Sequence, residues 1–334
     1  MSGRSASTLA ARYKKSRSFR SSSATMAASM IKPLALPQTS SGQPPTSIPR
    51  FVYGTAWKKE RSTGLVAKAI KAGFTGVDTA AQPRHYREDL VGEGIREALG
   101  EGRFKREDLY IQTKYTPPAG QDPNNLPYDP NSPVEAQVHA SIASSLHHLR
   151  TSNDDTAYID TLVIHSPLSS MPLTLTAWRT LETYVPHRIR NLGVSNTDLP
   201  TLRALYEAAT VKPAVVQNRF FSRTHYDVPL RRFCEENGII YQSFWTLTGN
   251  PQLLESKVVK QVAQVVGVSK EVGLYLCVMG LGKIVVLNGT TSEERMSEDL
   301  DGLRLWEEWY RIDESNQQNW QGYMNMFEKT IGDF

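Results

Sequence analysis

Six short apolar runs in this chain each end in a polar residue of a kind that takes part in chemistry. Apolar runs of this length, bounded by polar or turn residues, are typical of buried strands in a parallel sheet covered by helices. In a barrel of parallel strands, a polar residue at the carboxyl end of a strand indicates an active site. Six such ends in order are hard to explain by core packing alone. The end residues are Asp78, Lys114, His165, Ser195 with Asn196, Gln217, and Gln242 with Ser243.

Helical patterns alternate with strand patterns from Phe51 onwards, and eight strands are predicted in all. A chain of 334 residues is long enough for one (β/α)8 TIM barrel, which takes about 250 residues. We therefore predict this α/β fold as a single domain over residues 46–334. A doubly wound open sheet is the alternative, but it needs a glycine-rich phosphate loop after the first strand. Gly54-Thr55-Ala56-Trp57 does not supply one. The proline-rich stretch from Pro117 to Pro133 is predicted to be a long functional loop.

The first 45 residues are rich in Ser, Arg and Ala and then in Pro and Gln, so we predict a disordered tail that could be deleted without loss of stability. A mitochondrial transit peptide has a similar composition, and later translation starts at Met26 or Met30 are the alternatives. Residues 1–50 hold eight basic residues and no acid, which leaves 30 basic against 34 acidic residues in 51–334. This mildly acidic remainder gives no reason to expect a nucleic-acid partner.

The chain has no run of about 18 apolar residues, so no membrane span is predicted. Its two cysteines, Cys234 and Cys277, do not make a disulfide framework, and neither has metal-ligand spacing. This use of cysteine fits a reduced intracellular compartment. We expect a cytoplasmic monomer, with mitochondria as the alternative location.

Four residues of the chain form a candidate proton-transfer group: Asp78, Tyr86, Lys114 and His165. A tyrosine with its ordinary pKa of about 10 is a poor acid at neutral pH. A nearby lysine ammonium would lower that pKa toward the working range, and a carboxylate beside the lysine would keep it charged. A histidine could orient a carbonyl oxygen. This group suits the protonation of a carbonyl oxygen while hydride reaches the carbonyl carbon.

At these residues the sequence resembles the aldo-keto reductase family over about residues 50–310. The segments that are similar to family motifs, in chain order, are Gly73–Ala80, Tyr86 with 91–95, Thr113-Lys114, Leu162–Pro167, Leu192–Asn196 and Val216–Asn218. The resemblance implies a metal-free (α/β)8-barrel enzyme that reduces aldehydes or ketones with NADPH.

The resemblance also implies roles for individual residues. Asp78 and Lys114 would set the pKa of Tyr86, the proton donor, and His165 would orient the substrate carbonyl. Trp57 and Trp245 are further candidate substrate contacts, although core packing is the commoner role of tryptophan. The implied cofactor-binding residues are Thr55, Asp78, Ser195, Asn196, Gln217, Gln242, Ser243, Thr290, Arg295, Glu298 and Asp299.

Three positions depart from the family pattern. Tyr86 follows Asp78 by eight residues where the family usually has five, so His85 is the alternative proton donor. Gln242 stands where the family has a stacking aromatic residue. Gly289 stands where the family has a lysine for the cofactor 2′-phosphate, which leaves Arg295 to hold this group. NADPH is the expected cofactor and NADH is the alternative.

Two other functions remain open. The chain could be a non-catalytic regulatory subunit of the same fold that binds the cofactor, although the complete proton-transfer group favours an enzyme. A metal-dependent barrel hydrolase would need clustered histidine and carboxylate ligands, and only His165 lies at a strand end. Each candidate residue could also be purely structural, for example Asp78 as a turn cap. We expect a small-molecule carbonyl substrate, such as a ketone or 2-keto acid of secondary metabolism.

Overall fold

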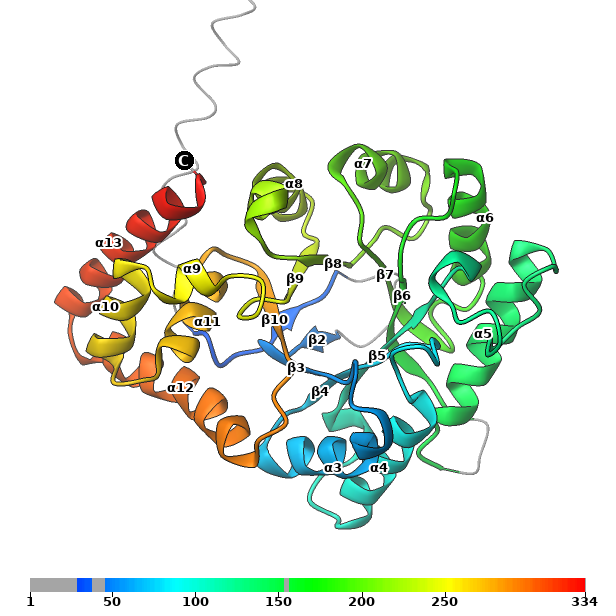
Figure 1. The fold of residues 1–334 in the computed structure, drawn as a ribbon, viewed down its shortest axis with the longest axis horizontal. Coiled ribbons are helices and arrows are strands. Elements are labelled where there is room, and N and C mark those ends of the chain that lie inside the picture. Colours follow the sequence, from blue (N-terminus) through cyan, green and yellow to red (C-terminus); the bar gives the residue numbers. More distant parts are fainter. Residues whose placement is uncertain (1–28, 38–45, 153–155, 334) are drawn as a thin grey trace, which may run out of the picture.

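A computed structural model of the chain describes residues 29–37, 46–152 and 156–333. Eight strands pair in parallel and close into a barrel, which confirms the predicted (β/α)8 fold (Figure 1). Each strand pairs with the next along the chain, and the last pairs with the first. The strands are β3 (Phe51–Gly54), β4 (Gly76–Asp78), β5 (Tyr110–Tyr115), β6 (Ile159–Ile164), β7 (Ile189–Ser195), β8 (Val215–Arg219), β9 (Ile240–Phe244) and β10 (Ile284–Asn288).

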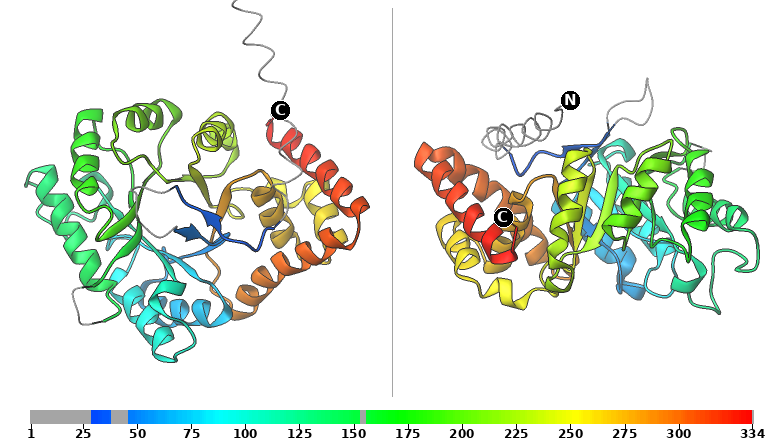
Figure 2. Two further views of the ribbon diagram at one scale, coloured as in Figure 1. Left: turned by 180° about the vertical axis from the view of Figure 1, so that it is seen from behind. Right: turned by 90° about the horizontal axis from the view of Figure 1, so that it is seen from above.

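Helices follow the strands and cover the outside of the barrel (Figures 1 and 2). The segment between β9 and β10 folds into three helices, because Ser256 begins a new helix by accepting the backbone N–H of Val259. The helices are α3 (Ser62–Ala72), α4 (Glu88–Gly100), α5 (Val134–His148), α6 (Met171–Glu182), α7 (Leu199–Ala208), α8 (Val228–Glu236), α9 (Pro251–Leu254), α10 (Lys257–Val266), α11 (Lys270–Gly280) and α12 (Glu293–Ile312).

A last helix, α13 (Glu314–Ile331), lies beside α12 and α10 and was not predicted (Figure 1). Its sequence is rich in Asn and Gln, but Trp320, Met324 and Phe327 form one buried stripe at helical spacing. A Cβ on Gly280 would lie 2.5 Å from the Met324 sulfur, so this glycine permits the close approach of α13 to α11.

The register of the barrel brings the polar strand ends to one level. Asp78 is the partner of Gln112 across β4 and β5, and Gln217 is the partner of Gln242 across β8 and β9. Because side chains alternate between the two faces of a strand, Lys114 points to the same side as Gln112. The fold therefore gathers these side chains inside the barrel.

A small antiparallel sheet lies across the opposite, amino-terminal end of the barrel (Figure 2, left). Its strands are β1 (Leu34–Ala35) and β2 (Ser47–Ile48). Leu36 and Ile48 are buried in one cluster with apolar residues from the beginnings of the barrel strands, such as Ile240. The prediction of a disordered tail through residue 45 is therefore wrong for residues 29–37. Their short apolar stretch folds because it covers the barrel end. The rest of the predicted tail, 1–28 and 38–45, lies outside the described residues.

Deleting residues 1–45 should therefore destabilise the protein, whereas the sequence alone predicted no effect. Met30 and Leu36 are only 3% and 4% exposed, and each would lose burial worth about 1.5–3 kcal/mol. We expect the thermal midpoint to fall by about 5 °C or more relative to a protein that lacks only residues 1–28. Differential scanning calorimetry of the two proteins checks this expectation, and equal midpoints would contradict it.

No helix within the described residues is long and apolar enough to cross a membrane by itself. Helices α10 and α11 reach that length and apolar character only as a pair, and they are bent by 104° relative to each other.

Candidate active site

A cavity of about 950 Å³ opens at the carboxyl ends of the strands. This volume lies within the usual range for cofactor and ligand sites. Four of the six predicted polar strand ends line this cavity: Asp78, His165, Ser195 with Asn196, and Gln217. Every barrel strand contributes at least one residue, at its end or just after it: Gly54, Asp78, Thr116, His165, Ser195, Arg219, Phe244 and Asn288.

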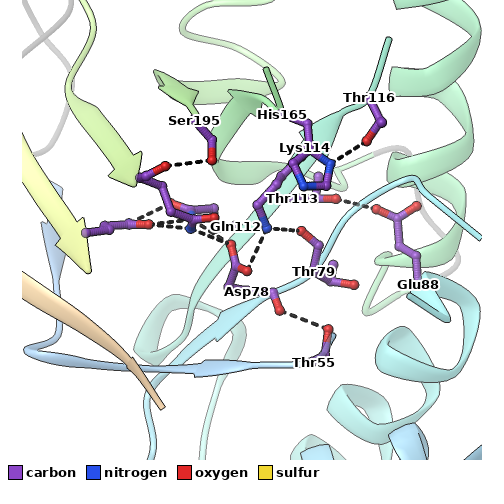
Figure 3. A network of polar contacts seen from close by, with 12 residues as sticks. Thr55, Asp78, Thr79, Glu88, Gln112, Thr113, Lys114, Thr116, His165 and Ser195 are labelled. Carbon is purple, nitrogen blue, oxygen red and sulfur yellow. Dashed lines mark hydrogen bonds and ion pairs between the residues drawn. The ribbon is translucent and has the colours of Figure 1, made fainter. Parts of the chain in front are cut away.

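Asp78 and Lys114 form a buried ion pair at this end of the barrel (Figure 3). Lys114 Nζ lies 2.6 Å from Asp78 Oδ2 and donates a second hydrogen bond to the Thr79 carbonyl at 2.8 Å. The two side chains are only 0% and 2% exposed, so solvent screens their attraction little. Burial lowers the pKa of Lys114, and the Asp78 carboxylate opposes this shift by stabilising the ammonium.

Tyr86 lies close to this pair and lines the cavity. Its ring centroid is 5.1 Å from Lys114 Nζ and 5.9 Å from the ring centroid of His165. The Tyr86 hydroxyl forms no hydrogen bond with any other described residue. The longer loop after Asp78 turns back through a backbone hydrogen bond from Tyr86 to Gln82 at 3.0 Å. The loop therefore still delivers the tyrosine to the cavity.

The pKa of Tyr86 is raised above its ordinary value, so burial outweighs the expected stabilisation of its tyrosinate by Lys114. Burial is the main cause, and the negative charge of Asp78 adds to it. Lys114 gives its hydrogen bonds to Asp78 and Thr79, and the described contact with Tyr86 is to the ring. Tyr86 therefore holds its proton at neutral pH.

His165 directly follows β6 and lines the cavity. Its Nδ1 lies 2.6 Å from the Thr116 hydroxyl, and its backbone carbonyl accepts a hydrogen bond from Asn196 (Figure 3 shows the first contact). Burial, helped by the charge of Lys114, lowers the pKa of His165 to about 3. The imidazole is therefore neutral at physiological pH. When Thr116 donates to Nδ1, the proton of the neutral ring is on Nε2.

Three glutamine side chains fill the barrel beneath Asp78. Gln112 donates to Asp78 Oδ1 at 2.6 Å, and Gln217 donates to the same oxygen at 3.1 Å. Gln242 accepts from both glutamines and donates back to Gln112 at 2.8 Å. This network holds the carboxylate of Asp78 in place.

Three predicted cofactor contacts do not line the cavity: Thr55, Gln242 and Ser243. Each is 0% exposed. Thr55 donates to the Asp78 carbonyl, Gln242 belongs to the glutamine network, and Ser243 bonds the Thr246 hydroxyl. Their internal hydrogen bonds explain the difference. The contact of these three side chains with a cofactor stays a prediction.

Ser195, Asn196 and Gln217 do meet at the cavity wall. Ser195 donates to the backbone carbonyl of Gln217 at 2.6 Å, and Asn196 donates to Ser195 Oγ at 3.1 Å. Asn196 has a positive φ of 52°, a conformation that asparagine tolerates better than most residues. Asn196 Oδ1 and Gln217 Oε1 have no hydrogen-bond partner among the described residues. They remain available as acceptors for a ligand.

The part of the cavity after β10 contains two cations. Lys58 donates to the carbonyl of Gly289, and burial lowers the pKa of Lys58 to about 8. Arg295 also lines the cavity. The expectation that Arg295 is the cation left there is therefore incomplete. The other predicted cofactor residues in this part of the cavity wall are Thr290, Glu298 and Asp299.

Asp299 is tied to the end of β10. Its carboxylate accepts a hydrogen bond from Asn288 at 2.7 Å, and Asn288 Oδ1 accepts one from the Thr290 backbone. Burial raises the pKa of Asp299 to about 6. These bonds fix the backbone at this corner of the cavity.

Two tryptophans with positive φ lie in the cavity wall. Trp57 and Trp245 have φ of 64° and 57°, and both are largely exposed. Such backbone strain in bulky residues is commonest at functional sites. The rings of Trp57 and His85 are tilted by 37° to each other, with 3.9 Å between their centroids, and His85 also lines the cavity.

The loop from Pro117 to Pro133 is attached to the loop that carries Tyr86. Gln82 donates to the Gly120 carbonyl at 2.7 Å, and Gln121 donates to the Ala81 carbonyl at 2.8 Å. Gly120 and Gln82 both line the cavity. The long loop therefore forms part of its rim.

The sequence analysis did not select Lys58, Gln112, Thr116 and Arg219. The last three lie two residues before or after a selected residue on the same strand or directly after it, and side chains repeat direction every two residues. That spacing could have identified them. In the described part of the chain, no three His, Cys, Asp or Glu side chains lie close enough to hold a metal ion.

Comparisons with known proteins give relatives of this chain in sequence and in fold. Residues 52–268 match the model of the Aldo/keto reductase family. The uncharacterized oxidoreductase YtbE of Bacillus subtilis is 32% identical over 256 residues, which cover 75% of this chain and 82% of YtbE. The D/L-glyceraldehyde reductase of Hypocrea jecorina is 28% identical over 294 residues, which cover 78% of this chain and 82% of that protein.

Solved structures share the fold. The crystal structure of the aldo-keto reductase AKR2E5 of the silkworm, Bombyx mori, matches with a TM-score of 0.66 at 20% identity, and the match covers 88% of each chain. The family model matches well over half of the sequence, which confirms the family resemblance. The chain belongs to the aldo/keto reductase family.

Proposed function

We propose that this protein reduces the carbonyl group of a small aldehyde or ketone with NADPH, and that Tyr86 donates the proton. The observation that carries the proposal is the grouping of Tyr86, the buried Asp78–Lys114 pair and the neutral His165 at one cavity. Family membership supports NAD(P)H as the reductant. A relative that is 28% identical is named D/L-glyceraldehyde reductase, and a neighbour with the same fold was solved in complex with NADPH.

The residues present fit a nicotinamide cofactor. A carboxamide needs acceptors for its two N–H groups, and Asn196 Oδ1 and Gln217 Oε1 have no partner among the described residues. Lys58 and Arg295 supply cations for phosphate groups at the other end of the cavity. When bound, the nicotinamide would supply the hydride for the carbonyl carbon.

The chain's own residues would orient and protonate the substrate. His165 would donate from Nε2 to the carbonyl oxygen, because Thr116 occupies Nδ1. Tyr86, which keeps its proton at neutral pH, would also face that oxygen and give up the proton as negative charge develops there. The ammonium of Lys114 would stabilise the resulting tyrosinate, and Asp78 would keep Lys114 charged.

The rate of reduction should show no inflection from His165 between about pH 5 and 8. An exposed histidine gains a proton as the pH falls through about 6.5. His165, whose pKa is lowered to about 3, stays neutral throughout this range. A profile of kcat/KM against pH checks this. An inflection at pH 6–7 that disappears in His165→Asn would show that His165 titrates normally.

A screen of NADPH and NADH oxidation across aldehydes, ketones and 2-keto acids tests the proposed function. We expect oxidation that depends on the carbonyl compound, with NADPH preferred because Lys58 and Arg295 can bind its extra phosphate. NADPH binding without oxidation of the cofactor by any carbonyl compound would instead support the regulatory subunit. A ketone or 2-keto acid of secondary metabolism, the monomeric state and the cytoplasmic location remain predictions from the sequence.

A further inference from the structure

Arg219, at the end of β8, has no polar partner within the described residues. It lies two residues beyond Gln217 on the same strand, so both side chains point to the same side, and both line the cavity. Arg219 is partly buried, and its Nε is fully buried without a hydrogen-bond partner. A buried donor left unpaired costs free energy, so native structures contain few of them.

Aromatic rings hold the guanidinium of Arg219 in place. Its Cζ lies 4.0 Å from the ring centroid of Trp245, and 5.5 Å from those of Phe221 and Phe244. Contacts between a guanidinium and ring faces leave the N–H groups free, because these lie in the guanidinium plane. The exposed Trp245, with its positive φ, is thus part of a support for a cation whose donors remain unused.

No carboxylate of the described chain neutralises Arg219. Four acidic residues line the cavity, namely Asp78, Glu271, Glu298 and Asp299. Asp78 pairs with Lys114 and Asp299 bonds Asn288, and none of the four pairs with Arg219. A free, oriented guanidinium matches the two oxygens of a carboxylate or phosphate group.

We propose that Arg219 binds an oxyanion, a carboxylate or a phosphate group, of a ligand in the cavity. The oxyanion belongs either to the carbonyl substrate or to the diphosphate of the cofactor, so the proposal rests on the proposed reductase function. Two residues along a strand span about 6.6 Å, so an anion at Arg219 would lie several ångströms from the nicotinamide carboxamide that Gln217 would hold.

The first arm of the test measures binding without turnover. Tryptophan fluorescence of the full-length protein follows titrations with NADPH, inorganic pyrophosphate and terephthalate, a dicarboxylate that cannot be reduced. If the oxyanion is the cofactor diphosphate, Arg219→Met should weaken the binding of NADPH and of pyrophosphate about ten- to a hundred-fold. If the oxyanion is a substrate carboxylate, Arg219→Met should weaken the binding of terephthalate alone. Arg223→Met is the matched control, because Arg223 is exposed and does not line the cavity.

The second arm compares kcat/KM for 4-carboxybenzaldehyde and its uncharged methyl ester. If Arg219 binds the substrate carboxylate, Arg219→Met should lower kcat/KM for the acid about ten- to a hundred-fold. The kcat/KM for the ester should be nearly unchanged. Arg219→Lys keeps the positive charge but lacks the two parallel N–H donors of the guanidinium, so it should retain part of the preference for the acid. This variant also keeps the test decisive if Arg219→Met does not fold.

The proposal is overturned if the Arg219 variants bind all three probes as tightly as the unmodified protein does and if the ratio of kcat/KM for the acid to kcat/KM for the ester is also unchanged. Equal weakening in Arg223→Met would also overturn it, because the effect would then be general electrostatics. If no carbonyl compound is reduced, the proposed function fails, but the fluorescence titrations still decide whether Arg219 binds an oxyanion.

Discussion

Replacing Tyr86 by phenylalanine is expected to lower kcat for carbonyl reduction by at least about a hundred-fold, the lower end of what general acid catalysis contributes. The change removes only the hydroxyl, which makes no hydrogen bond to other described residues, so folding and cofactor affinity should be nearly unchanged. Steady-state kinetics and a cofactor titration of the variant measure both quantities. Tyr323→Phe is a suitable control, since it removes a hydroxyl from α13, away from the cavity lining.

Residual activity decides between two donors. If Tyr86→Phe keeps more than about a tenth of the turnover, acid catalysis by Tyr86 is excluded, because it is worth about 10²–10⁴ in rate. His85 would then become the candidate, since it lines the same cavity one residue earlier.

Replacing Lys114 by methionine is expected to destabilise the fold as well as to lower activity. The change leaves the Asp78 carboxylate buried without its counter-charge, and breaking such a pair costs about 3–5 kcal/mol. The hydrogen bonds from Gln112 and Gln217 soften the loss, so the lower end of the range is expected. Urea unfolding measures the change in the free energy of unfolding.

The matched control for this variant is Lys68→Met. Lys68 pairs with Glu293 at 3.0 Å, but the two side chains are 51% and 57% exposed. An exposed pair contributes less than about 1 kcal/mol, so this control should unfold almost like the unmodified protein. Equal stability of the two variants would show that the buried pair contributes no more than a surface pair.

The barrel could be predicted because its strands are apolar on both faces and end in polar residues. The geometry of parallel strands then predicts, without any knowledge of contacts, that the polar residues at the strand ends converge. These residues are Asp78, Lys114, His165 and Gln217. The same argument does not reveal β1 (Leu34–Ala35), because a two-residue strand is defined by the barrel end that it covers.

The hydrogen bonds of the buried side chains at the site could not be predicted from the sequence. The family resemblance placed Gln242 and Ser243 at the cofactor, but the direction of a buried side chain depends on partners across the barrel, such as Gln112. The pKa of Tyr86 likewise depends on its burial, which the sequence does not show. Arg219 could have been found, since it repeats the direction of Gln217 two residues later.

The transfer of deuterium from cofactor to product tests the central claim most directly. The protein would be incubated with NADPH that carries deuterium at both C4 positions of the nicotinamide and with a carbonyl compound that it turns over. The alcohol would be analysed by mass spectrometry and NMR. Direct reduction in the cavity predicts deuterium on the carbinol carbon of the product. Alcohol without deuterium on that carbon, or no alcohol with any carbonyl compound, would contradict the assignment as a carbonyl reductase.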